Sequence, residues 1–116
     1  MAVRRKLNVV WTLTAQGDLS SIIDYIADES AEEAGLVFDR IRKAAAKLYV
    51  LPQRGRLVPE LLQYGIRNYR ELIVGPWRLL YRVSEAKVFV VAVIDSRRNV
   101  EDLLLERFCR EPFGPE

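Results

Sequence analysis

The sequence predicts an α+β fold in which a helical hairpin packs on a largely antiparallel four-stranded sheet, with an N-terminal strand and a short C-terminal helix. Two observations lead to this prediction. Apolar residues between positions 15 and 51 recur every three to four residues, which is the period of an amphipathic helix. Residues 66–94 instead form short β-branched and aromatic runs that are separated by turn residues.

The N-terminal part of the chain predicts a strand followed by a helix. Residues 7–11 form a short run of β-branched and aromatic side chains, which is typical of a strand. We expect Thr14 to cap the helix that follows, because apolar residues then recur at helical spacing as far as Ile26. Asp18 falls between the apolar positions, so it is expected to face solvent.

A second helix is predicted to begin at Ser30. Ser30 and Glu33 form a capping box, in which the serine oxygen and the glutamate carboxylate bind free amides at the start of a helix. The apolar stripe then continues to Leu51, and Pro52 ends the helix. Only a few residues separate the two helices, so they are expected to pack against each other as an antiparallel hairpin.

The remainder of the chain predicts three strands and a last helix. Residues 52–65 contain prolines and glycines and are expected to form a connection with a short turn. Strands are predicted at residues 66–74, 77–83 and 87–94, joined by tight turns. The last of them is apolar on both faces, as in an interior strand of a sheet. Asn99 is then expected to cap a short helix.

Length and composition predict a small single-domain protein without a membrane span, a disulfide or a zinc cluster. We expect residues 1–116 to form one domain with a frayed tail from about residue 110. The longest apolar stretch, residues 88–94, is far shorter than a membrane span of about 20 residues, and no signal peptide is recognisable. Cys109 is the only cysteine and histidine is absent, so neither an internal disulfide nor a zinc cluster is predicted. We therefore expect a cytoplasmic protein without a metal or other cofactor.

Charge is unevenly distributed along the chain. The net charge is +2, but residues 40–98 contain 13 basic and 4 acidic side chains, whereas residues 1–39 contain 3 basic and 7 acidic ones. The middle segment is therefore expected to attract a phosphate backbone or an acidic protein surface, although a basic face can also serve solubility alone.

Arginine side chains of the predicted strands are expected to share one exposed face. Strand alternation places Arg78 and Arg82 opposite Trp77, and the Trp77 face is expected to pack on the helical hairpin. The other face would remain uncovered, and pairing with the preceding strand would bring Arg70 beside Arg78 and Arg82. Such a cluster offers rigid guanidinium forks for phosphates or carboxylates.

A metal-free ribonuclease is one chemistry that this face could support. Such an enzyme needs a base, an acid and cations that stabilise the charge of the transition state. The cations are present, but without histidine the proton carriers would have to be other groups. Glu71 could carry protons or, as we favour, pair with a neighbouring arginine. The candidate catalytic set is Arg70, Glu71, Arg78, Tyr81, Asp95 and Arg97.

Four segments of the chain, in order, match the motifs of one protein family. They are VVWTLTAQGDLSSIIDYI from Val9, LPQRGRLVPEL from Leu51, YRELIVGPWRLLYRV from Tyr69 and VFVVAVIDSRRNVEDLL from Val88. Together they resemble the RelE/ParE superfamily of bacterial toxin–antitoxin toxins, and the chain looks closer to ParE than to RelE. The resemblance implies a RelE/ParE-like β-α-α-β-β-β fold with a small C-terminal helix.

The resemblance also implies a function. ParE-type members are described as inhibitors of DNA gyrase that block replication, and RelE-type members as ribosome-dependent mRNA endoribonucleases. Toxins of this family are held inactive by a cognate antitoxin, here a ParD-like one, whose C-terminal segment folds on the toxin in a hetero-oligomer. The residues expected to contact the target or the antitoxin are Arg56, Arg70, Arg78, Arg82, Arg97, Arg98, Leu104, Leu105 and Phe108.

Two departures from the family pattern weaken the ribonuclease interpretation. Many relatives carry histidine before the final arginine pair, whereas this chain has Asp95 and Ser96 before Arg97 and Arg98. The second helix also lacks the lysine-rich end of RelE-type nucleases. We therefore expect a toxin that inhibits gyrase by binding. A RelE-like endoribonuclease, direct binding of nucleic acid and a non-toxic relative that only binds its antitoxin remain open alternatives.

Overall fold

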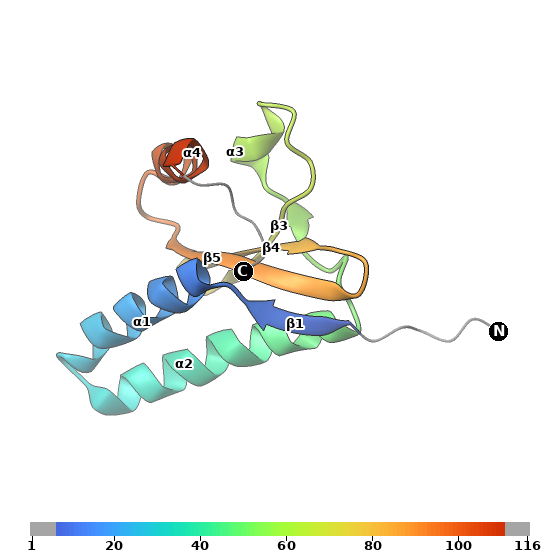
Figure 1. Ribbon diagram of the computed structural model, residues 1–116. Helices are drawn as coiled ribbons and strands as arrows, with labels where there is room; N and C mark the ends of the chain where they lie inside the picture. Colours follow the sequence, from blue (N-terminus) through green and yellow to red (C-terminus); the bar gives the residue numbers. More distant parts are fainter. Residues whose placement is uncertain (1–6, 111–116) are drawn as a thin grey trace.

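The computed structural model describes the backbone of residues 7–110 and the side chains of residues 7–107. These residues form a five-stranded sheet with the strand order β1-β5-β4-β3-β2 (Figure 1). β1 is parallel to β5, and the other neighbouring strands are antiparallel. The strands are β1 (Asn8–Trp11), β2 (Arg56–Leu57), β3 (Arg70–Val74), β4 (Trp77–Val83) and β5 (Lys87–Asp95). The helical elements are α1 (Leu13–Ala27), α2 (Ala31–Ala46), the 3₁₀ turn η1 (Lys47–Tyr49), α3 (Pro59–Leu62) and α4 (Val100–Arg110).

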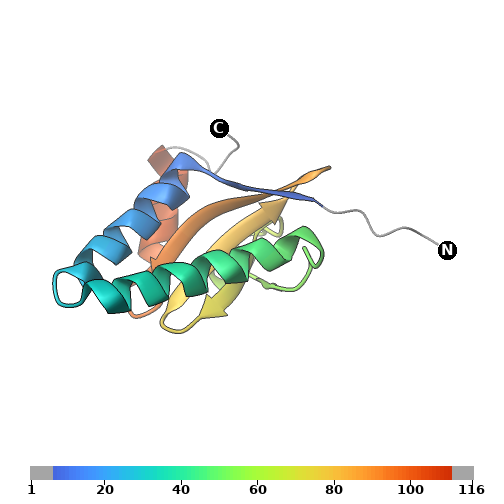
Figure 2. The same cartoon turned by 90° about the horizontal axis from the view of Figure 1, so that it is seen from below.

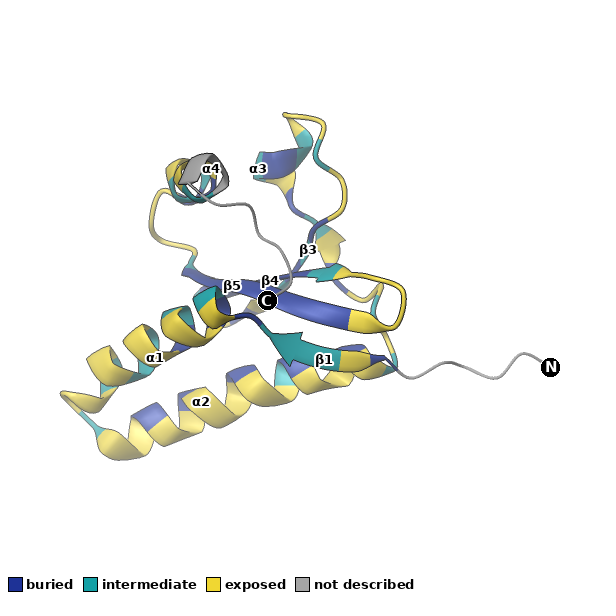
Figure 3. Ribbon diagram, viewed as in Figure 1, coloured by how far each residue is buried: buried dark blue, intermediate teal, exposed yellow. Residues whose placement is uncertain are grey.

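Helices cover both faces of the sheet. α1 and α2 form an antiparallel hairpin on one face, and α3 and α4 lie on the other (Figures 1 and 2). Each face has its own buried cluster: one includes Ile41, Leu79 and Tyr81, and the other includes Leu80 and Leu104. The strands are mostly buried, whereas the outer surfaces of the helices are exposed (Figure 3). The α+β fold is confirmed, but the prediction that one sheet face stays uncovered is wrong, because α3 and α4 pack on it.

One extra residue in β5 shifts which core its side chains enter. Leu80 of β4 pairs with Ala92, and the next residue, Tyr81, pairs with Val90, so Val91 has no partner position on β4. Val91 and Ala92 both belong to the cluster on the α3–α4 side, whereas Val90 belongs to the cluster under the hairpin. A bulge of this kind shifts the alternation of side chains by one residue. Val91 and Ala92 therefore enter the same core, whereas residues 88–94 are apolar throughout because helices cover both faces of the sheet.

The first helix begins two residues earlier than predicted. Thr12, not Thr14, is its N-cap: the Oγ1 atom accepts a hydrogen bond from Ala15 N at 3.2 Å and donates one to Val90 O at 3.0 Å. Thr12 is buried, and its hydroxyl joins the start of the helix to β5. The local sequence does not show which of the two threonines caps the helix. The choice depends on β5, whose carbonyl binds Thr12.

The other two predicted helix caps are confirmed. Ser30 Oγ accepts the amide of Glu33 at 3.1 Å at the start of α2, and Asn99 Oδ1 accepts the amide of Asp102 at 3.1 Å at the start of α4. α2 gives way to η1 shortly before the proline that was expected to end it. Among residues 7–110, no helix is long and apolar enough to cross a membrane.

Two strands differ from the sequence prediction. β2 is only two residues long, lies within the segment predicted as a connection, and makes the sheet five-stranded rather than four-stranded. β3 begins at Arg70 and not at residue 66, because residues 63–69 lead from α3 back to the sheet. Two residues are too few to show the alternation that marks a strand. β2 is therefore defined only by its pairing with β3.

Candidate functional site

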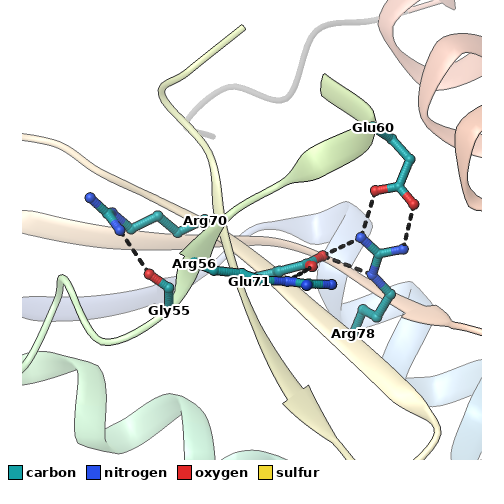
Figure 4. Close-up of polar contacts among 6 residues, drawn as sticks. All are labelled: Gly55, Arg56, Glu60, Arg70, Glu71 and Arg78. Carbon is teal, nitrogen blue, oxygen red and sulfur yellow. Dashed lines mark hydrogen bonds and ion pairs between the residues drawn. The ribbon is translucent and has the colours of Figure 1, made fainter. Parts of the chain in front are cut away.

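Four charged side chains form a continuous network between β2, α3, β3 and β4 (Figure 4). Glu71 of β3 is 1% exposed, and its two carboxylate oxygens accept hydrogen bonds from Arg56 Nε and Arg78 Nε, each at 2.7 Å. The Arg78 guanidinium also binds both carboxylate oxygens of Glu60 on α3, at 2.7 and 2.8 Å. Two carboxylates thus face two guanidinium groups, so the network carries no net charge.

This network holds α3 against the sheet. Bidentate arginine–carboxylate contacts fix geometry as well as charge, and a four-residue helix is too short to be stable alone. Hydrogen bonds to Glu60 raise the pKa of Arg78, and in return the hydrogen bond from Arg78 lowers the pKa of Glu60. Because a buried charge is costly unless it is paired, each member of the network depends on the others.

The lowered pKa of Glu60 links stability to pH. A carboxyl whose pKa falls on folding stabilises the fold above its ordinary value of 4.5, and this contribution is lost as the pH drops through the folded value. Urea unfolding from about pH 6 to about pH 3 should show the loss, and Glu60→Gln should make the dependence shallower. The control, Glu85→Gln in the exposed turn between β4 and β5, should keep the wild-type dependence. Equal slopes for all three proteins would contradict this role of Glu60.

Gly55 connects the network to the hairpin side of the sheet. Its N–H donates to Tyr81 Oη at 2.8 Å, and its carbonyl accepts from Arg70 Nη1 at 2.8 Å. A Cβ atom at this position would lie 2.5 Å from the carbonyl oxygen of Glu71 and 2.7 Å from Tyr81 Oη, so only glycine fits. Tyr81 is fully buried, and burial raises the pKa of its phenol. Tyr81 therefore belongs to the interior and not to a surface that a substrate could contact.

The predicted arginine surface of Arg70, Arg78 and Arg82 does not form. Arg78 and Arg82 share a face, as predicted, but Arg78 is 6% exposed and is bound by carboxylates on two sides. Arg70 pairs with Tyr81 and lies on the opposite face, and Figure 4 shows its side chain directed away from Arg78. Glu71 occupies the place beside Arg78 that was expected for Arg70. The error lies in the register between two strands, which alternation within one strand does not determine.

Asp95 and Arg97 form a separate pair at the end of β5. The Asp95 carboxylate accepts hydrogen bonds from Arg97 Nε at 2.8 Å and from Nη2 at 2.6 Å, and this bonding lowers the pKa of Asp95. A carboxyl group held in its ionised form is a poor proton donor. Arg97 remains largely exposed, and the neighbouring Arg98 is exposed without an ion pair to any described residue.

The candidate ribonuclease residues do not meet at one site. Asp95 pairs with Trp77 at one end of β4, whereas Arg70 pairs with Tyr81 towards the other end and on the hairpin face. An enzyme of this type needs its acid, base and cations around one substrate position. The predicted pairing of Glu71 with neighbouring arginines is confirmed instead.

The predicted contact residues of α4 divide into buried and exposed positions. Leu104 is 1% exposed and packs in the cluster on the α3–α4 side, so the prediction that its side chain is exposed is wrong. Leu105 is 36% exposed, as expected for a contact residue. The side chain of Phe108 and the predicted tail from residue 111 lie outside the described residues. On β2, Arg56 keeps 60% of its side chain exposed although it binds the network.

Asp18 has a structural role that the sequence did not reveal. It was predicted to face solvent, but its carboxylate accepts a hydrogen bond from Val93 N at 3.0 Å and binds Arg107 of α4 at 2.7 and 2.8 Å. β1 ends at Trp11, so the amide of Val93 has no strand partner on that side, and Asp18 takes its place. An acidic residue on an amphipathic helix ordinarily faces water, and no local pattern marks this exception.

Comparison with known proteins identifies the family. Residues 9–100 match the family model described as the ParE toxin of the type II toxin–antitoxin system parDE. The chain belongs to the ParE toxin family. A curated relative, Toxin RelE2 of Caulobacter vibrioides, is 36% identical over 91 residues, which cover 78% of this chain and 96% of the relative. The resemblance to the RelE/ParE superfamily that the motifs indicated is confirmed.

Two solved structures share the fold of this ParE-family chain. A chain of the chromosomal ParDE system of P. aeruginosa aligns with a TM-score of 0.64 at 20% identity, covering 78% of this chain and 96% of that one. A chain of the toxin–antitoxin complex RelBE2 from Mycobacterium tuberculosis aligns with a TM-score of 0.53 at 21% identity, covering 82% and 97%. At these identities the likeness shows the fold alone.

Proposed function

We propose that this chain is the toxin of a type II toxin–antitoxin system and that it inhibits DNA gyrase in the cytoplasm. Its match to the ParE family over residues 9–100 carries the proposal. The positions of the charged residues support it, because the candidate ribonuclease residues lie on opposite faces and at opposite ends of the sheet. An inhibitor that acts by binding needs an exposed contact surface and no catalytic centre.

A cognate antitoxin would cover the outer surface of the helical hairpin and hold the toxin inactive in a hetero-oligomer. Tyr25, Leu36 and Phe38 are exposed on α1 and α2, and Arg42 stacks at 5.0 Å from the ring centre of Trp11. Exposed apolar side chains are typical of protein contact surfaces. The ParDE and RelBE2 structures that share the fold are toxin–antitoxin systems. An antitoxin segment that folds on this surface would bury these side chains.

A supercoiling assay tests this function. The purified chain should inhibit the supercoiling of relaxed plasmid by gyrase, and the cognate antitoxin should restore it. Phe38→Ser should weaken the restoration, whereas Ile73→Ser, at an exposed position on β3, should not. Cleavage of ribosome-bound mRNA with undisturbed supercoiling would make the ribosome the target. Inactivity in both assays would favour a non-toxic relative that only binds its antitoxin.

A further inference from the structure

Exposed acidic side chains gather at one end of the molecule. Residues 7–39 contain seven acidic side chains and no basic one. Five of the seven are exposed at or near the turn between α1 and α2, and none of these five makes an ion pair with a described residue. This acidic tip consists of Asp24, Asp28, Glu29, Glu32 and Glu33. In Figures 1 and 2 the turn lies at one extremity of the molecule.

The opposite extremity is basic. Lys87 at the start of β5 pairs with Asn8, and the amide of Leu7 binds the carbonyl of Tyr49 at 2.9 Å, which brings η1 to the same end of the sheet. The turn between β4 and β5 lies here as well, far from the α1–α2 turn (Figure 2). Glu85 is the acidic side chain of that turn. The basic end consists of Lys47, Arg54, Arg70, Arg82 and Lys87.

The basic end offers cations that a ligand could bind, whereas the charge of Arg78 is already paired with two carboxylates. Lys47, Arg54 and Lys87 are exposed and make no ion pair with a described residue. Arg82 is half-buried, and its guanidinium carbon lies 4.6 Å from the ring centre of Phe89. Stacking of this kind orients the guanidinium plane without consuming its charge.

We propose that the basic end binds the phosphate backbone of duplex DNA, with the acidic tip directed away from it. The strands at this end, spaced by about 4.8 Å, make it about 20 Å wide, enough to contact phosphates on both sides of the roughly 12 Å major groove. Attraction at one end and repulsion at the other would orient the approaching molecule. The inference goes beyond gyrase inhibition and does not require it.

An acidic protein surface is the main competing partner for these cations. Protein interfaces generally place charged side chains around an apolar centre. At the basic end the cations instead come from η1, the loop before β2 and the starts or ends of three strands, so they follow a rim. A row of separate cations fits contact with a row of phosphates, which positions a protein on DNA without reading its sequence.

The salt dependence of DNA binding tests the proposal on the purified chain alone. Fluorescence anisotropy with a labelled duplex of random sequence would measure the association constant. If five phosphates are neutralised, the logarithm of that constant should fall with log salt at a slope of about −4.5, a loss of about 500-fold between about 50 and about 200 mM. A salt-independent constant, or no binding at the lowest salt, would overturn the proposal.

Matched variants locate the contact. Arg54→Gln should reduce the slope to about −3.6, and the double variant Arg54→Gln/Lys87→Gln should reduce it to about −2.7 with roughly tenfold or greater loss of affinity at low salt. Arg40→Gln removes the same charge from an exposed site on α2, and its slope should stay at the wild-type value. Equal effects of Arg40→Gln and Arg54→Gln would mean that only net charge matters, which overturns the assignment.

Competition experiments separate DNA from the other partners. Poly-glutamate at equal charge should displace the duplex poorly, because a flexible chain does not hold its carboxylates in fixed rows as a duplex holds its phosphates. If poly-glutamate displaced the labelled duplex as effectively as unlabelled DNA does, the DNA assignment would be overturned. An association constant for duplex RNA equal to that for duplex DNA would overturn it as well. Oligomers at low salt that excess DNA fails to dissociate would show instead that the basic end binds the acidic tip of another copy. Gyrase is absent from these measurements, so their failure leaves the supercoiling result unaffected.

Discussion

Replacing Arg78 with methionine is expected to lower the free energy of unfolding by about 3–5 kcal/mol. The buried guanidinium binds both Glu71 and Glu60, and it joins β4 to α3. Without it, the buried carboxylate of Glu71 keeps only Arg56, whose own side chain is mostly exposed. Urea denaturation of the wild type and the variant at neutral pH measures the loss, provided that both proteins show the same slope of unfolding free energy against urea concentration.

Arg98→Met is the matched control for this variant. Arg98 is exposed and has no ion pair to a described residue, so the same substitution there should change stability by less than about 0.5 kcal/mol. If Arg78→Met proved as mild as Arg98→Met, the carboxylates would not need the guanidinium. The network would then not be what holds α3 on the sheet.

Gly55→Ala is the second substitution with a large expected effect, a destabilisation of about 3 kcal/mol or more. The new methyl group would lie 2.5 Å from the backbone oxygen of Glu71 and 2.7 Å from Tyr81 Oη. To admit it, the chain must move away from β3 and lose the hydrogen bond between Gly55 N and the buried tyrosine. Thermal or urea unfolding would show the loss.

Gly35→Ala provides the opposite case in the same molecule. Gly35 lies in the exposed interior of α2, and an added Cβ there meets nothing within 4 Å. Alanine should therefore stabilise the protein by about 0.5–1 kcal/mol through its higher helix propensity. A similar change in stability for both substitutions would argue against the tight contact at Gly55.

The parts of the fold that repeat with a regular period could be predicted from the sequence. The heptad-like stripe of α2 and the alternation of Trp77, Leu79 and Tyr81 reflect which side chains enter the core. The same alternation correctly placed Arg78 and Arg82 on one face. Local periodicity therefore suffices where burial of apolar area decides the structure.

The charged site could not be predicted in this way, because its contacts link residues that are far apart in the sequence. Arg78 binds Glu60, 18 residues away, and Glu71, 7 residues away, on different elements. The charge of Arg78 suggested exposure, and only the register of β3 against β4 reveals that carboxylates surround it. Asp18 was missed for the same reason, since its partners Val93 and Arg107 lie near the other end of the chain.

A double-mutant cycle between Arg78 and Glu71 tests most directly whether Arg78 is an internal support and not a contact residue. Arg78→Met, Glu71→Gln and the double variant would be compared by urea denaturation. We expect a coupling energy of at least about 2 kcal/mol, with the double variant less destabilised than the sum of the single ones. A coupling energy near zero would contradict the network and would leave Arg78 available to a partner.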